Sequence, residues 1–336
     1  MLTKVQYDYL KHDLVLPGVW DTIVKESPVI QRLSWKDVNN DIVKYNVELT
    51  MPTVSWLQPQ DLITENTGTI AQRTTEIFTV IGDADTDKSM IAMNPLQNPE
   101  RNDIEAKAKA MAHTVETTMI LGQTTTLSST KQFKGFQRII AEFETASTTD
   151  LDALNNSQVQ VGANAASGAL TMKAMMELLD QIRPGKADML LMSRRARNKL
   201  TALQQASGGG SGAGLVMTDL KEFGLRVPSF DDVPIFVCDF IPDNFQDGAS
   251  SVLDIVNYNP NLYPTTRPSG YDNTMIFALK VGEEDVTGLQ AGGMKHERET
   301  FIENKNVIRN RFSWNVSAMC KKKYSLAVLI NVNPDS

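Results

Sequence analysis

The chain has 336 residues, of which 41% are apolar and 22% are charged, a composition typical of a soluble globular protein with room for two compact domains or for one domain with large extensions. Its formal net charge of −7 argues against a dedicated nucleic-acid-binding protein, although a local basic patch remains compatible with it. Cys238 and Cys320 have no short spacing, so they indicate neither a disulfide framework nor a zinc site. No stretch has the length of a signal-peptide core or of a membrane-spanning helix.

The first 40 residues predict an N-terminal arm. In "LPGVWDTIVKES", Pro17 suits a first helical turn, and Trp20 lies on the apolar side of the short helix that follows. Pro28 ends this helix, and "VIQRLSW" supplies a second short amphipathic segment. Neither segment can bury a core of its own, so we expect both to pack on another surface.

Residues 42–92 predict a long two-stranded arm. "VKYNVELT" alternates apolar and polar residues, which indicates a strand with one apolar face, and "TEIFTVIG" is the expected second strand. The segment between them is longer than most loops and contains Trp56, Leu57 and Ile70. A lone hairpin is marginal in water, so the apolar face and the long tip indicate a partner such as another copy of the chain.

Residues 99–121 predict a helix roughly 35 Å long. Asn98 is a candidate N-cap, Pro99 suits the first helical position, and Gly122 can end the helix. Its apolar residues recur at steps of three and four and form a narrow stripe. We therefore expect the helix to lie across one sheet.

The following residues alternate between helix and strand patterns, which predicts a second domain of mixed α/β class. We expect a helix in "ALTMKAMMELLDQI", a buried strand in "ADMLLMS", and a helix in "RRARNKLTALQQ" that Ser193 caps. Further strands are expected in "VPIFVCDF", "VLDIVNY" and "TMIFALKVG". A strand of roughly 45 Å follows, with the apolar residues between Ile308 and Cys320 on one face, before "SLAVLINV" closes the chain.

One acidic motif resembles the start of a calcium loop. "DADTDK" places Asp83, Asp85 and Asp87 in D-x-D-x-D spacing, but Lys88 and Asn94 stand where that loop needs glycine and glutamate. We interpret the motif as a solvated turn, or as an acidic edge that discourages stray strand pairing.

No motif indicates catalysis or a cofactor. "SGGGSGAG", within Ala206–Leu215, follows a helix where a phosphate loop would follow a strand, so we interpret it as a flexible surface loop. His12, His113 and His296 are scattered and have no metal-ligand spacing. We therefore expect no enzymatic activity, no metal and no cofactor.

A cluster of basic residues lies near the C-terminus, with no acidic residue between Asn304 and Pro334. It is either a solvated strand face or a patch that meets an acidic surface of a neighbouring subunit or packaged nucleic acid. Its members are Lys305, Arg309, Arg311, Lys321, Lys322 and Lys323.

The order of these elements resembles the major capsid proteins of tailed bacteriophages, the Hong Kong 97-type capsid fold, over nearly the whole chain. "PGVWDTIVKESPVIQRLSW" looks like the N-arm of that family, and "NPERNDIEAKAKAMAHTVETTMILG" looks like its spine helix, with "FKGF" after it. "FGLRVPSFDDVPIFVCDFIPD" resembles a strand of the axial domain, and "VTGLQAGGMKHERETFIENKNVIRNRFSW" resembles the return into the peripheral domain.

The resemblance implies an α+β fold in four parts. They are an N-arm at 1–40, an extended hairpin or E-loop at 41–92, a peripheral domain at 93–140 and 281–320 with the spine helix at 99–121, and an α/β axial domain at 141–280 and 321–333. Because the chain starts almost directly at the arm, any scaffold is expected to be a separate protein, or the sequence to be already mature. No lysine–asparagine crosslink pair can be matched.

The function implied is a self-assembling icosahedral or prolate shell of hexamers and pentamers in the virion, built in the host cytoplasm around double-stranded DNA. Implied partners are other copies of the chain, scaffolding, portal and decoration proteins, and DNA through weak non-specific contact. Candidate intersubunit contacts are Trp20, Trp56, Leu57 and Ile70, with intrachain packing as the alternative for each. The turn "PDNFQDGASS" is a candidate for the capsomer axis. The alternatives are an encapsulin-type nanocompartment shell, a soluble α/β enzyme, and a tail or decoration protein.

Overall fold

The computed structural model describes residues 27–50, 52, 54–59, 61–62, 67–93, 99–123, 131–144, 158–161, 169–206, 215–220, 225–241, 274–303 and 305–333. Four of the sequence predictions lie outside these residues. They concern Trp20 with most of the N-arm, the Asn98 cap, the glycine tract, and the segment that holds both "VLDIVNY" and the turn "PDNFQDGASS".

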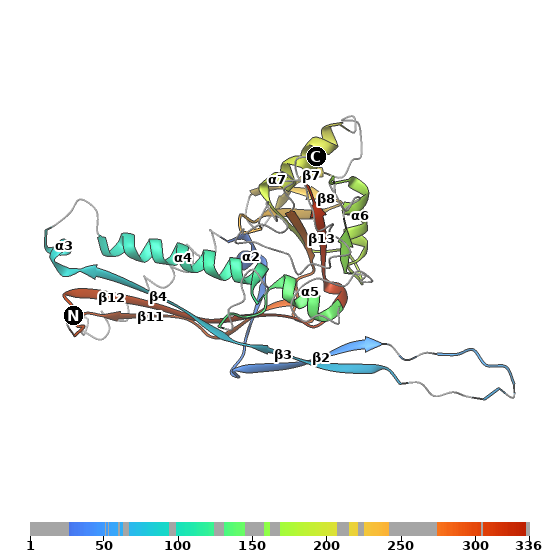
Figure 1. The fold of residues 1–336 in the computed structure, drawn as a ribbon, viewed down its shortest axis with the longest axis horizontal. Helices are drawn as coiled ribbons and strands as arrows, with labels where there is room; N and C mark the ends of the chain where they lie inside the picture. Colours follow the sequence, from blue (N-terminus) through green and yellow to red (C-terminus); the bar gives the residue numbers. More distant parts are fainter. Residues whose placement is uncertain are drawn as a thin grey trace, which may run out of the picture.

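Two sheets and a projecting hairpin make up the described chain (Figure 1). The lower sheet has four strands in the order β1–β11–β12–β4, with β1 parallel to β11 and the other pairs antiparallel. Its strands are β1 (Ser34–Asp37), β4 (Phe78–Asp87), β11 (Val286–Glu299) and β12 (Val307–Cys320). The predicted alternation along β12 is confirmed from Arg311 to Val316, where Phe312, Trp314 and Val316 are buried and the residues between them are partly exposed, but from Ser317 to Cys320 both faces are buried.

The spine helix α4 (Pro99–Leu121) lies along β4, as Figure 1 shows. In its first half only one side is buried, as the narrow stripe predicts, but Thr118–Leu121 are buried all round. The helix ends before Gly122, as expected. A Cβ on Gly135 would lie 2.5 Å from the amide nitrogen of Gly122, so this crossing of two backbones requires glycine.

The upper sheet has seven strands in the order β5–β13–β10–β6–β9–β8–β7. They are β5 (Val159–Val161), β6 (Met189–Met192), β7 (Leu215–Leu220), β8 (Leu225–Phe230), β9 (Val233–Val237), β10 (Thr274–Leu279) and β13 (Leu326–Val332). The boundaries proposed at 281 and 321 fall between β10 and β11 and between β12 and β13, where the chain passes from one sheet to the other.

Helices cover both faces of this upper sheet. Leu190 and Met192 of β6 pack with α6 (Met172–Asp180) and α7 (Arg194–Ala206), and the intervening Met189 and Leu191 pack with α5 (Phe136–Glu144) and the end of α4. Both predicted helices and the buried strand between them are therefore confirmed, including the cap, since Ser193 Oγ accepts a hydrogen bond from the amide of Ala196 at 3.2 Å.

The hairpin pairs β2 (Ile42–Thr50) with β3 (Thr69–Glu76), so the sequence prediction of its second strand was wrong. "TEIFTVIG" straddles a break at Ile77, after which β4 leaves the hairpin and pairs with β12. Both segments suit a strand locally, and only the long-range pairing separates them. The range 41–92 thus also contains β4 and the short helix α3 (Lys88–Ala92).

The remaining short elements are α2 (Pro28–Arg32) and the 3-10 turn η1 (Lys323–Ser325). Within the described residues, no helix combines the length and the apolarity that crossing a membrane requires.

The side chain of Trp35 holds β1 against the other strands of the lower sheet. Its indole nitrogen donates a hydrogen bond to the carbonyl of Ile30 at 3.2 Å, and its ring centroid lies 5.0 Å from that of Trp314. In the parallel register Trp35 is opposite Gly288, where a Cβ would lie 2.7 Å from the indole ring. The ring therefore occupies the space that a side chain at this position would need.

This contact predicts that Gly288→Ala displaces β1. The free energy of unfolding should fall by about 1–3 kcal/mol, because the added Cβ would meet both the indole ring and Leu33, and the ring is held in place by Trp314. Urea denaturation of the full chain measures the change. Gly82→Ala is the matched control, since its Cβ would meet only the flexible side chains of Lys107 and Met111, and it should cost clearly less.

Candidate functional site

The histidine, cysteine and acidic side chains of the described residues do not gather into a metal site. No group of three or more histidine, cysteine or acidic side chains within them is arranged to hold a metal ion. His113 packs on the ring of Phe240, and His296 stacks on Phe312 with its Nε2 atom 3.1 Å from Asn310 Oδ1. His12 lies outside the described residues. The distinctive features are instead the hairpin, its attachment and the charges on the lower sheet.

The hairpin tip carries the most exposed large apolar side chains of the described chain. Trp56 is 102% exposed and Leu62 is 90% exposed, so neither packs on its own chain. The predicted contact residues Leu57 and Ile70 are also exposed. Exposed apolar side chains gathered at the end of a projecting arm are typical of an interaction site.

The base of the hairpin, by contrast, is buried against its own chain. Val47 is only 2% exposed, and Tyr45 packs against the same core. Ser317 Oγ on β12 donates to the carbonyl of Glu76 at 2.8 Å. Part of the apolar face that the alternation of β2 predicts, at Tyr45 and Val47, thus packs within the subunit, whereas the tip is exposed.

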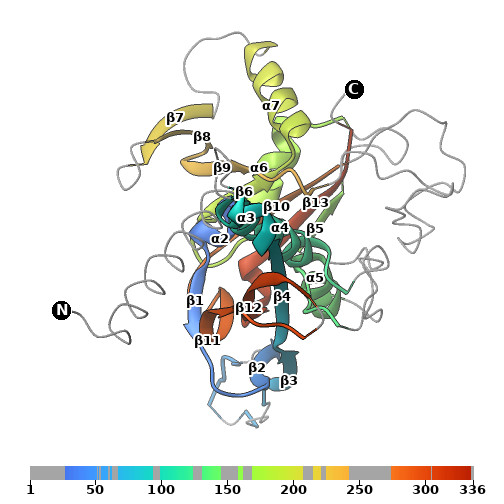
Figure 2. The same ribbon diagram turned by 90° about the vertical axis from the view of Figure 1, so that its left-hand side faces the viewer.

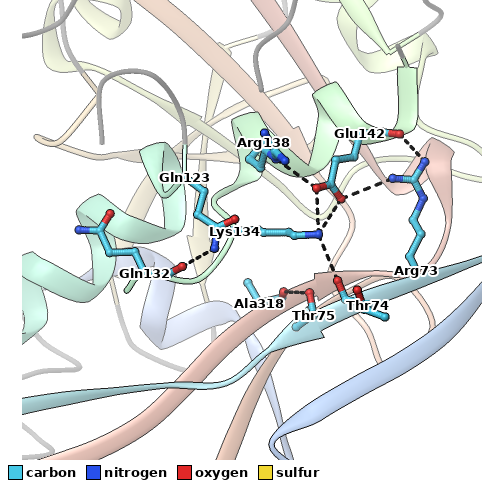
Figure 3. A network of polar contacts seen from close by, with 9 residues as sticks. All are labelled: Arg73, Thr74, Thr75, Gln123, Gln132, Lys134, Arg138, Glu142 and Ala318. Atoms are coloured by element: carbon cyan, nitrogen blue, oxygen red, sulfur yellow. Dashed lines mark hydrogen bonds and ion pairs between the residues drawn. The ribbon is translucent and has the colours of Figure 1, made fainter. Parts of the chain in front are cut away.

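A cluster of cations around Glu142 fixes β3 to α5 (Figure 3). Lys134 Nζ lies 2.8 Å from one carboxylate oxygen and 3.0 Å from the other, and it also donates to the carbonyl of Thr74 on β3 at 3.1 Å. Arg138 Nε donates to the carboxylate at 3.1 Å from the same helix. The three side chains are largely buried.

Arg73 completes this Glu142 cluster from the hairpin. Its guanidinium hydrogen-bonds the backbone carbonyl of Glu142, its Nη1 atom lies 3.6 Å from the carboxylate, and it stacks over the ring of Phe143 at 4.5 Å. Sequence reasoning missed this cluster. The i,i+4 pair of Arg138 and Glu142 is a weak signal, and nothing local relates α5 to Arg73, which is 69 residues away.

The D-x-D-x-D motif lies on β4, an edge strand, and pairs with the basic residues of β12. Asp85 is opposite Arg309 and Asp83 is opposite Arg311, each held by two hydrogen bonds of 2.6–2.9 Å. These arginines hold the pKa values of both carboxyl groups below their usual range. The acidic-edge interpretation therefore fits the structure, and the solvated-turn interpretation was wrong.

The third acid of the motif and the other predicted basic residues have different roles. Asp87 caps α3 by accepting from the amide of Ser89 at 2.8 Å. Lys305 lies 3.9 Å from Asp85, at the same end of β12 as the arginines. At the opposite end are Lys321, Lys322 and Lys323, of which Lys321 bonds Glu284 at 2.7 Å and Lys322 lies 3.7 Å from Asp285. The basic residues thus form two groups, and their contact with a neighbour or with DNA stays a prediction.

Comparison with known proteins gives a clear answer at the level of structure. No protein-family model matches the sequence, and no curated protein sequence matches it. The holo-SrpI encapsulin complex from Synechococcus elongatus matches with a TM-score of 0.61 at 17% identity, over 92% of this chain and 89% of that one. The cyanophage A-1(L) capsid matches with a TM-score of 0.61 at 12% identity, over 91% of this chain and 92% of that one.

The capsid of the native GTA particle matches with a TM-score of 0.60 at 13% identity, over 93% of this chain and 90% of that one. The chain therefore has the Hong Kong 97-type capsid fold, a mixed helix and sheet architecture. Identities this low show the fold alone, so the function has to be argued from the surfaces.

The Glu142 cluster predicts that Glu142→Gln weakens the attachment of the hairpin. Three largely buried cations would lose their shared carboxylate, so the free energy of unfolding should fall by about 2 kcal/mol. Chemical denaturation of the full chain measures this. Glu177→Gln removes the partner of Lys173 in an exposed i,i+4 pair and should cost less than about 0.5 kcal/mol. Equal effects of the two changes would contradict a special role of Glu142.

The charge ladder predicts a pH-dependent cost for the double variant Asp83→Asn and Asp85→Asn. Because the pKa values of both acids are lowered in the folded state, their stabilisation is present above their usual pKa and is lost as the pH falls through the lowered values. The variant should lose about 1 kcal/mol at pH 7 and less near pH 3, below the usual carboxyl pKa of 3.8. Urea denaturation at both pH values tests this against a control with Asp37→Asn and Asp41→Asn, two exposed carboxylates.

Proposed function

We propose that this chain is the repeating subunit of a closed protein shell and, within that class, the major capsid protein of a tailed bacteriophage. The observation that carries the proposal is the hairpin. Its base is fixed by Glu142 and by β12, while its tip presents Trp56 and Leu62 to solvent. Such a surface is of no use to a monomer, and it is explained if the tip packs on another copy.

The structural matches support the same proposal. They include the capsids of cyanophage A-1(L) and of a GTA particle computed with C5 symmetry, and structures of the mycobacterium phages Adephagia and Bobi. By analogy, we propose pentamers and hexamers of this chain in a virion shell around double-stranded DNA, assembled in the host cytoplasm. Scaffolding, portal and decoration proteins would be its other partners. The proposal assigns the chain no catalysis and no cofactor.

Weak DNA contact is proposed for the two basic groups at the ends of β12. Arg309 and Arg311 are already paired with carboxylates, which reduces the attraction that they can exert on phosphate. The net charge of −7 works against binding of DNA outside a shell. Contact with packaged DNA would therefore depend on its high local concentration inside the shell.

An encapsulin-type shell is the second candidate, and a specific observation favours it. The holo-SrpI encapsulin complex matches as well as the phage capsids in TM-score, at 17% identity. The two candidates predict different contents. Shells purified from the native source and treated with nuclease should contain protected double-stranded DNA for a capsid, or a co-purifying cargo protein for an encapsulin. Recovery of only a compact monomer under all conditions would contradict both.

The hairpin tip gives a direct test of assembly. The double variant Trp56→Ala and Leu62→Ala should fold with unchanged stability, because both side chains are exposed, but it should assemble into shells at least about tenfold less efficiently. Negative-stain microscopy and light scattering measure assembly. Met176→Ala, an exposed apolar residue on α6, is the control and should assemble normally. Normal shells from the double variant would contradict the role of the tip.

A further inference from the structure

One carboxyl group on the spine helix is buried without an ion pair of the kind that holds Glu142. Glu116 of α4 is 1% exposed. Its Oε1 atom accepts a hydrogen bond from Cys238 Sγ at 3.1 Å, and the hydroxyl of Ser27 is its other hydrogen-bond partner. Both partners are neutral groups. A buried carboxyl group with neutral partners is costly to ionise, so its protonation state is coupled to the packing around it.

Three separate segments meet at Glu116. Ser27 is the N-cap of α2, where its Oγ atom accepts from the amide of Ile30 at 3.3 Å. Cys238 directly follows β9, and its amide donates to the carbonyl of Met192 on β6 at 3.0 Å. The Glu116 junction, which we define as Ser27, Glu116 and Cys238, therefore joins the start of α2 and the end of β9 to the spine helix. The three residues are almost completely buried.

The charged and titratable groups of the packed elements have other contacts. Asp239 pairs with Arg194 through two hydrogen bonds of 2.6 Å. Arg32 of α2 lies over the ring of Phe236 at 5.3 Å. His113, one turn before Glu116 on α4, packs on Phe240 at a centroid distance of 5.0 Å. Because histidine is the usual pH-responsive side chain in proteins, any test must separate the effect of His113 from that of Glu116.

We propose that Glu116 is a proton-operated latch that fastens the start of α2 and the end of β9 onto the spine helix. With its proton, the carboxyl group is neutral like its two partners, and the junction stays closed. When the proton is lost, a negative charge is left in a buried site near the carboxylate of Asp239. This charge is stabilised when water enters the site. The junction therefore opens locally while both sheets stay folded.

The carboxyl group of Glu116 gains or loses its proton near neutral pH. Burial raises the pKa of its carboxyl group to about 7; Asp239 adds to the rise, and the hydrogen bonds with Cys238 and Ser27 offset part of it. Burial and the nearby Glu116 raise the pKa of the Cys238 thiol far above its usual value, so the thiol keeps its proton. A raised carboxyl pKa means that the folded state binds the proton more tightly than the unfolded one. The latch is thus strongest on the acid side and weakens as the pH rises through about 7.

Amide hydrogen exchange of the full chain tests the latch, with wild type and Glu116→Gln compared at the same pH so that the intrinsic rates cancel. In residues 27–33 and 238–241, wild type should exchange at the same rate as the variant near pH 4, below the ordinary carboxyl pKa, and about a hundredfold faster at pH 8.5, since a rise of the pKa from 4.5 to about 7 exceeds two units and each unit corresponds to a factor of ten. Residues 274–279 of β10 should show no difference at either pH. A rate ratio that does not change with pH would overturn the proposal.

Two further variants keep the test decisive. His113→Gln should retain the pH-dependent exchange of wild type, and its loss would assign the effect to His113 and overturn the proposal. Asp239→Asn removes the charge that helps to raise the pKa of Glu116, so the pH at which exchange accelerates should move lower. If Glu116→Gln does not fold, this shift decides the question, and an unchanged midpoint would contradict the latch.

Discussion

The buried half of the spine helix is the contact on which the rest of the structure depends. Met111, Val115 and Met119 belong to one core cluster that also includes residues of α5 and of strands from both sheets. The end of α4 is buried all round, and the two backbones cross at Gly122 and Gly135 with no space for a side chain. Because protein interiors are packed to the density of organic crystals, this shared core joins the two sheets into one body. In Figure 2 the helix is seen between them.

The hairpin depends on that body for its position. A two-stranded ribbon is marginal in water, and here its base is stabilised by the core, by β12 and by the Glu142 cluster. Burying the base within the subunit leaves the tip free. The hairpin therefore carries a small apolar contact surface away from the two sheets, and less of its apolar face than the sequence predicts is available to a partner.

In the lower sheet, the charged residues of β4 and β12 fix the register in which these strands pair more than they attract a partner. Arg309 and Arg311 are two residues apart, and so are the acids opposite them on β4. A slip of one residue would turn both carboxylates to the other face, so the ladder favours one pairing of these two long strands. Its position on an edge strand also protects the sheet against stray pairing. The buried Glu116 is the contrasting case, because it has no such cation partner. We therefore expect this carboxyl group to change its protonation state near neutral pH.

The sequence by itself determined the parts whose signal is local. Periodicity gave the spine helix and the alternating faces of β12, capping gave the start of α7, and the order of the elements was specific enough to indicate the capsid fold. The tertiary structure decided which strands pair and which charges meet. The hairpin's second strand was misplaced because "TEIFTVIG" suits a strand on either side of Ile77, and only its partners distinguish β3 from β4. Arg73 reaches Glu142, and Cys238 reaches Glu116, across 69 and 122 residues. Such contacts leave no periodic trace in the sequence, because they depend on how separate segments pack and not on the spacing within any one of them.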